Sequence, residues 1–253
     1  MLKNYKLLLR YDGTKYHGWQ RQPGLRTVQG ELEGALSVIT RQEAAVTGVS
    51  RTDAGVHAYE YVCNTQLDTE HDTAVLFRAV NGILDDDIRL IEISVCPDEF
   101  NARFDAAGKT YVYTIDNTPY GEPFLKGRAW RCKRGLDFEK MCRAAEQFTG
   151  THDFSSFMSA GSETVDFTRT IYACRLSKSE RIIEMEITGN GFLYNMVRII
   201  AGTLVSVGLG RIAPEEISEI ILKKDRRHPG ITAPPQGLML YKVYYSREDI
   251  HVC

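Results

Sequence analysis

The chain has 253 residues, of which 43% are hydrophobic and 25% charged, and its net charge is -2. This composition is typical of a globular protein and excludes a disordered, collagen-like or disulfide-scaffold chain. The chain contains no run of 18 apolar residues that would predict a transmembrane helix, and its first residues lack the apolar core of a signal peptide. We therefore expect a cytoplasmic protein with no membrane partner. The overall charge gives no support for nucleic-acid binding, although a local basic groove is compatible with it.

The first half of the chain predicts strands and helices in alternation. Apolar and β-branched runs predict strands at 5–11, 44–49, 59–67 and 89–96. Thr27 is a candidate N-cap of an amphipathic helix, and Asp72 or Thr73 is a candidate cap of a second helix that ends near Leu84.

The second half has a similar plan. It predicts strands at 110–116, 170–177, 181–188 and 238–245. A helix is expected to follow Asp137 and to run through Thr149, with Gly150 as its left-handed cap. A long apolar helix is expected over 192–208, and Pro214 opens a short one.

Closely spaced strand pairs indicate antiparallel neighbours, so the fold class is α+β rather than a doubly wound parallel sheet. We expect two related α/β halves, 1–105 and 106–253, that share a mixed, mainly antiparallel sheet.

Cysteine and histidine residues, six of each, are dispersed along the chain without a CxxC pair or zinc-ligand spacing. The cysteines are therefore predicted to be reduced packing residues, and no metal site is predicted.

A dense polar segment at 50–57 interrupts two apolar runs. Within it, Arg51 and Asp53 are two residues apart and would share a face of an extended chain, while Gly55 suits a position that a Cβ would crowd. The segment is either a surface hairpin loop or a rigid loop that presents a carboxylate.

Arg198 lies within the apolar helix expected over 192–208. A buried guanidinium stays charged and needs an anionic partner, which would be a carboxylate or a bound phosphate. Asp53 is the candidate of most interest, and an ordinary structural salt bridge is the alternative.

Tyr111 and Tyr113 point to the same face of the strand at 110–116, close to Lys109. They are either part of a half-buried strand or an aromatic surface on which a base can stack. Basic residues that recur in loops, Arg21 among them, form either a solvated face or a rim for a polyanion.

Seven segments together resemble the tRNA pseudouridine synthase A family, from end to end of the chain. The most specific is RTDAGVHA at 51–58, which matches the catalytic signature. The others are YDGTKYHGWQ at 11–20, TVQGELE at 27–33, KTYVY at 109–113, HDFSSF at 152–157, GFLYNMVR at 191–198 and TAPPQGL at 232–238. Ser50 stands where the family often has glycine, and both residues are small.

The resemblance implies that the chain isomerises uridines at positions 38, 39 and 40 in the anticodon arm of tRNA, as a homodimer without cofactor or metal. Asp53 would be the catalytic aspartate in the N-terminal half, and the C-terminal half would complete the cleft. Tyr111 would stack on the target base, Arg198 would pair with Asp53, and Arg51 would bind RNA or hold the flipped nucleotide. Leu193 is expected in the apolar wall of the pocket, or simply in the core.

Three other functions remain open at this point. A catalytically silent tRNA-binding protein would use the same groove, and a glycoside-type hydrolase would need a second carboxylate that no segment identifies. The residues alone indicate a soluble α+β enzyme of unknown substrate.

Overall fold

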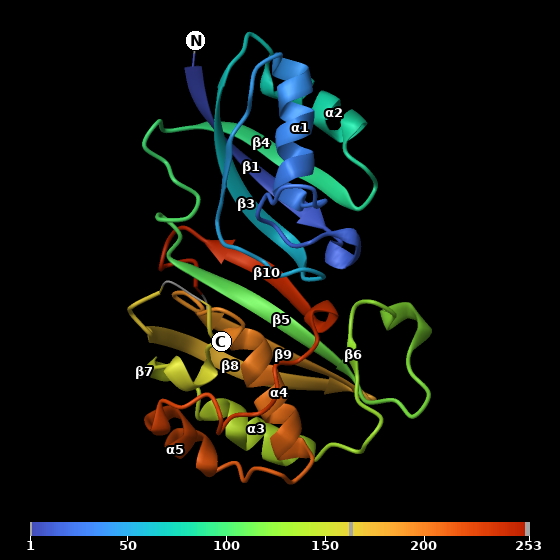
Figure 1. Ribbon diagram of the computed structural model, residues 1–253, viewed down its shortest axis with the longest axis vertical. Coiled ribbons are helices and arrows are strands. Elements are labelled where there is room, and N and C mark those ends of the chain that lie inside the picture. Colours follow the sequence, from blue (N-terminus) through green and yellow to red (C-terminus); the bar gives the residue numbers. More distant parts are fainter. Residues whose placement is uncertain (1, 162–163, 251–253) are drawn as a thin grey trace. The chain divides into compact units, whose positions relative to one another are not determined.

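The computed structural model describes residues 2–161 and 164–250. The chain forms two compact units, one of Met1–Ala107 with Met239–Ser246 and one of Gly108–Leu238 with Arg247–Cys253 (Figure 1). The last strand thus belongs to the unit that the first strands build.

The first unit has a sheet in the order β4-β1-β3-β10, with β2 on the edge of β3. Its strands are β1 (Leu2–Tyr11), β2 (Val46–Gly48), β3 (His57–Asp68), β4 (Ile88–Cys96) and β10 (Leu238–Tyr244). Strand β1 runs antiparallel to both β3 and β4, while β10 runs parallel to β3, with Met239 opposite His57. The pairing of β10 with β3 therefore begins at His57, the last residue of the polar segment at 50–57.

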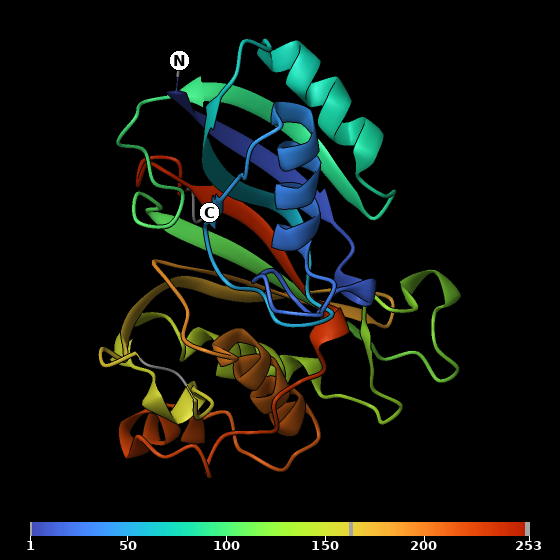
Figure 2. The same cartoon turned by 45° about the horizontal axis from the view of Figure 1, so that its top comes forward.

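Two helices, α1 (Val28–Thr40) and α2 (Thr73–Ile83), lie against one face of this sheet (Figure 2). The Thr27 side chain accepts a hydrogen bond from the Gly30 N–H, and that of Asp72 accepts one from the Val75 N–H. Both predicted N-caps are therefore confirmed, because each side chain satisfies a backbone donor that the first turn leaves unpaired.

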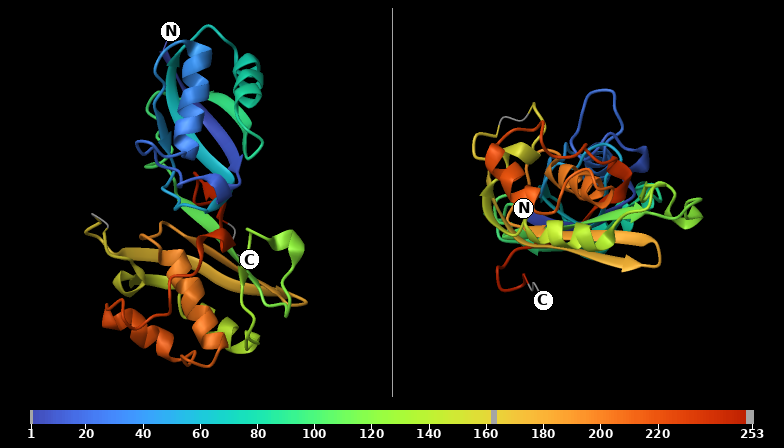
Figure 3. Two further views of the ribbon diagram at one scale, coloured as in Figure 1. Left: turned by 45° about the vertical axis from the view of Figure 1, so that its right-hand side comes forward. Right: turned by 90° about the horizontal axis from the view of Figure 1, so that it is seen from below.

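The second unit has a sheet in the order β5-β9-β8-β7, with the short β6 beside β5. Its strands are β5 (Gly108–Asp116), β6 (Trp130–Arg131), β7 (Gly150–Asp153), β8 (Thr168–Ser179) and β9 (Ile182–Gly189). Helices α3 (Phe138–Glu146) and α4 (Met196–Gly208) pack on one face of it, and α5 (Glu216–Lys223) lies next to β7 at the edge of the sheet (Figure 3). The predicted β8–β9 hairpin is confirmed, and in this sheet only β5–β6 among the described pairs is parallel.

The α+β class and a mixed, mainly antiparallel arrangement are thus present in each unit. None of the helices in residues 2–161 and 164–250 has the length and hydropathy that a membrane span requires.

Two predicted helix boundaries were wrong. Helix α4 begins at Met196 instead of residue 192, because Asn195 has a left-handed backbone with a φ of 61°. Arg198 therefore lies in the first turn of α4, half-buried, and not in the middle of a buried helix. Helix α3 ends at Glu146, and Gly150, with a φ of 116°, opens β7 instead of capping the helix.

Candidate active-site loop and the second-unit residues

The loop that carries Asp53 joins β2 to β3 and is fixed by its backbone. The Trp19 N–H donates to the Thr52 carbonyl at 3.1 Å, and the Gly55 N–H donates to the Tyr16 carbonyl at 3.3 Å. A turn closes within the loop, where the Val56 N–H donates to the Asp53 carbonyl at 3.1 Å. Residues 16–19 therefore form backbone hydrogen bonds with the loop on both sides of Asp53.

Glycines allow this close approach of two backbones. Gly18 has a φ of 87°, and a Cβ at this position would lie 2.5 Å from the Thr52 oxygen and 3.1 Å from the Asp53 carbonyl carbon. A Cβ on Gly13 would lie 2.0 Å from the Val56 oxygen. Any other residue at either position would displace the loop.

A buried aromatic cluster supports the loop from the core. Trp19 stacks on Tyr61 with ring centroids 4.0 Å apart, and Tyr11 lies 5.5 Å from Tyr61. The Tyr61 hydroxyl donates to the Ser50 carbonyl at 2.5 Å, and the Tyr11 hydroxyl shares a hydrogen bond of 2.8 Å with the Thr52 hydroxyl. The hydroxyls of these rings thus satisfy polar groups of the loop while the rings fill the core.

Side chains along the loop differ in burial. Thr52 is buried against Tyr11, whereas Asp53 is half-buried and Arg51 is exposed. Next to them, the buried His57 ring accepts a hydrogen bond from the Gly13 N–H through Nδ1 at 3.0 Å. The arrangement can present the Asp53 carboxylate from a backbone that has little freedom to move.

Tyr111 lies on β5 in the second unit, opposite Ile187 of β9. The residue is 6% exposed, and its ring makes a T-shaped contact with Phe192, with ring centroids 5.1 Å apart. Two residues further on, the buried Tyr113 hydroxyl donates to the Pro234 carbonyl at 2.7 Å. Burial raises the pKa of Tyr113 far above its usual value, although Arg198 lowers it, so the hydroxyl stays protonated.

Arg198 contacts two neutral oxygens of its own unit. Its Nε donates to the Ala233 carbonyl and its Nη1 to the Asn195 side-chain oxygen, each at 2.8 Å. The Ala233 N–H donates back to the Arg198 carbonyl at 3.0 Å. Arg198 therefore joins the start of α4 to the segment before β10. Leu193, just before α4, is buried.

Tyr111, Leu193 and Arg198 all belong to the second unit, whereas Arg51 and Asp53 belong to the first. Sequence reasoning missed the support of the Asp53 loop by Gly18 and the aromatic cluster. The glycine and tryptophan at 18–19 mark an unusual backbone position within a polar loop, but they do not indicate which segment packs against it.

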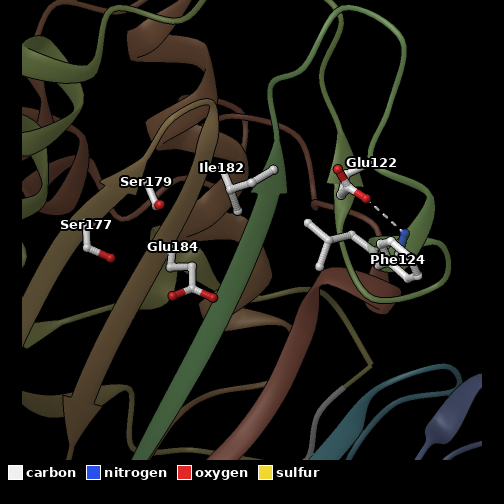
Figure 4. A pocket seen from close by; sticks show the side chains of 7 residues that line it. Glu122, Phe124, Ser177, Ser179, Ile182 and Glu184 are labelled. Carbon is white, nitrogen blue, oxygen red and sulfur yellow. Dashed lines mark hydrogen bonds between the residues drawn. The ribbon is translucent and has the colours of Figure 1, made fainter.

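An open hollow of about 500 Å³ lies elsewhere on the second unit. Figure 4 shows Ser177, Ser179, Ile182 and Glu184 of the β8–β9 hairpin on one side, and Glu122 accepting a hydrogen bond from the Phe124 N–H on the other. Among the described residues that line it, none is a predicted site residue. Within the described ranges, no three His, Cys, Asp or Glu side chains come together as metal ligands.

The sequence is similar to proteins of one family. A family model described as tRNA pseudouridine synthase matches residues 144–246. A tRNA pseudouridine synthase A of Thermoanaerobacter sp. (strain X514) is 44% identical over 96% of this chain and 100% of its own length. A tRNA pseudouridine synthase A of Acetivibrio thermocellus shows the same identity and coverage.

One solved structure, an archaeal box H/ACA sRNP Nop10–Cbf5 complex, is 13% identical with a TM-score of 0.35, over 79% of this chain and 44% of that chain. That likeness is too low to support a conclusion. The relatives with 44% identity, in contrast, align with 96% of this chain and with their own full length. The chain therefore belongs to the tRNA pseudouridine synthase A family, a family of isomerases.

Proposed function

We propose that this enzyme converts uridines 38, 39 and 40 in the anticodon stem-loop of tRNA to pseudouridine, with Asp53 as the catalytic carboxylate. Relatives with 44% identity carry the name tRNA pseudouridine synthase A. The observation that carries the residue assignment is the fixed backbone of Asp53, whose neighbour Thr52 is held by the Trp19 N–H. A group that must reach one sugar carbon benefits from such positioning.

The reaction exchanges one bond for another within the same nucleotide. The N1–C1′ bond breaks, the base turns, and a C5–C1′ bond forms. The proton on C5 then leaves to a base, and N1 ends with a proton, so that the composition of the nucleotide is unchanged. Asp53 acts either by forming a covalent adduct with the sugar or by promoting a glycal intermediate, and it can accept the C5 proton afterwards.

The other predicted residues have roles in holding the substrate. Taking the target base out of its stack costs a few kcal/mol. In the proposal, stacking on Tyr111 and contacts from Arg51 offset that cost, while Leu193 forms part of the apolar wall that retains the free base. In the proposal, Arg198 is the charged partner of Asp53.

The proposed partner is the anticodon arm of tRNA, in the cytoplasm, and the proposed assembly is a homodimer. These three points depend on membership of the family. Sedimentation velocity of the full chain, alone and with tRNA, measures both the assembly and the binding.

The test is tritium release from tRNA that carries uridine tritiated at C5. The wild-type chain should release tritium, while Asp53→Asn should release none and bind tRNA within tenfold of the wild type. Asp98→Asn is a matched control, because it makes the same charge change at an exposed side chain. Normal release by Asp53→Asn would contradict the assignment of this residue. Binding without release by the wild type would favour a catalytically silent tRNA-binding protein.

A further inference from the structure

Glu33 is a charged residue where the inner face of α1 would ordinarily carry an apolar one. Its side chain is 7% exposed. One carboxylate oxygen accepts hydrogen bonds from the Val46 N–H at 3.0 Å and from the Gln29 amide at 2.9 Å. The other oxygen lies 3.3 Å from Nη1 of Arg21. A buried carboxylate is costly unless it is paired, so its retention here suggests a role beyond packing.

Gln29 extends this arrangement to the segment before α1. Its side-chain oxygen accepts from the Arg21 N–H at 2.8 Å and from the Gln20 amide at 3.0 Å. Its amide donates to Glu33 and to the Val46 carbonyl at 3.0 Å. The two side chains therefore connect residues 20–21 to both α1 and β2.

The first turn of α1 holds the same segment through its backbone. The Val28 N–H donates to the Gly18 carbonyl at 3.2 Å, and the Gln29 N–H donates to the Trp19 carbonyl at 3.0 Å. These two N–H groups are among those at the start of a helix that have no acceptor within the helix. Residues 18–21 are thus attached to α1 by their carbonyls and by Arg21.

The opposite side of this segment contacts the Asp53 loop. The Trp19 N–H donates to the Thr52 carbonyl, and the Gly18 backbone packs against Thr52 and Asp53. A displacement of residues 18–21 away from α1 would therefore move the backbone of Asp53 with it.

We propose that Glu33, Gln29 and Arg21 form a clasp, the α1 clasp, that positions the catalytic loop for the isomerisation. The proposal rests on the proposed function of Asp53. Glu33 is a positioning residue in it, since the contacts run from Glu33 through Arg21 and Trp19 to Thr52. A displacement of 1 Å at a reacting group can cost about 10²-fold in rate, so a small loosening of the clasp should affect turnover more than binding.

The test compares Glu33→Gln with Glu43→Gln, an equal change of charge at an exposed residue just beyond α1. For Glu33→Gln we expect kcat on C5-tritiated tRNA to fall about tenfold, with KM changed less than twofold. Amide exchange should become at least fivefold faster in 17–22 and 50–56, with exchange in β1 unchanged. Glu43→Gln should alter none of these quantities.

Arg21→Gln keeps the test decisive if Glu33→Gln folds poorly, because the Arg21 side chain is 61% exposed. It should reproduce the faster exchange in 50–56, and adding Glu33→Gln to it should change that rate less than twofold. Unchanged exchange in both single variants would overturn the clasp, as would an equal increase in β1, which marks a purely structural role. A raised KM with unchanged exchange would instead make Arg21 a tRNA contact. If the wild type lacks isomerase activity, the proposed function fails, while the exchange rates still decide whether the clasp holds the loop.

Discussion

Replacing Gly18 by alanine tests how strictly the position of Asp53 depends on backbone packing. The φ of 87° at this residue would cost an alanine about 1–2 kcal/mol. Its Cβ would also lie 2.5 Å from the Thr52 oxygen. A Cβ essentially never comes within 3.0 Å of a heavy atom outside its own and its neighbouring residues, so the Thr52 oxygen must move by at least about 0.5 Å.

The two effects have different consequences. Overpacking costs about 1–3 kcal/mol, so the free energy of unfolding should fall by about 2–5 kcal/mol in total. A displacement of about 0.5 Å beside Asp53 should lower kcat about tenfold, given that 1 Å can cost about 10²-fold. Urea unfolding measures the first quantity, and tritium release at a temperature where the variant is folded measures the second.

Gly24→Ala provides the matched control. Gly24 lies in the same segment with a φ of 73°, but a Cβ there would meet nothing within 4 Å. This variant should lose only about 1–2 kcal/mol and keep its kcat. If Gly18→Ala and Gly24→Ala lose equal stability and both remain fully active, contact with the Thr52 carbonyl does not position Asp53, and the reasoning is refuted.

Two further predictions concern the second unit. Arg198→Met removes charge-assisted hydrogen bonds to Ala233 and Asn195, so unfolding should become easier by about 1.5–3 kcal/mol and tritium release should fall; an equally stable, fully active variant would contradict the proposed pairing. Burial raises the pKa of Asp116, but hydrogen bonds from Thr118 and Glu122 outweigh it and hold the pKa below its usual range. This carboxylate therefore contributes stability that is complete above about pH 4 and is lost as pH falls through the native pKa. Asp116→Asn should weaken the pH dependence of urea midpoints in that acid range, and an unchanged profile would argue against this contribution.

Local signals in the sequence predicted the helix starts well. Thr27, Asp72 and Asp137 each accept a hydrogen bond from a backbone N–H three residues later, as an N-cap residue does. The preference of these residue types for the N-cap position depends only on the residue and its immediate neighbours. A helix start can therefore be predicted without knowledge of the rest of the fold.

Helix α4 shows where such local reasoning fails. The sequence is apolar from Phe192 onwards, and an apolar run without periodicity does not mark where a helix begins. Asn195 interrupts the run, since asparagine tolerates the left-handed region better than most residues. Its side-chain oxygen then accepts a hydrogen bond from Arg198, a contact that holds the guanidinium beside the start of the helix.

The support of the Asp53 loop could not be predicted in the same way. Gly18 and Thr52 are far apart in the sequence, and nothing in either segment specifies the other as its neighbour. Strand β10 likewise pairs with β3, although the chain between them includes nearly all of the second unit. Periodicity predicts which residues face a core, but it does not predict which two backbones approach each other.

Both units place their candidate residues by contacts between backbones in which glycine provides the space. In the first unit, Gly18 lets the chain before α1 lie against Thr52. In the second, a Cβ on Gly202 of α4 would lie 1.8 Å from the Ile231 oxygen, two residues before the Ala233 carbonyl that accepts from Arg198. A backbone held in this way has few alternative positions, because a small movement either opens a gap or creates a clash. The precision that an isomerase needs at one sugar carbon can therefore come from glycines that never touch the substrate.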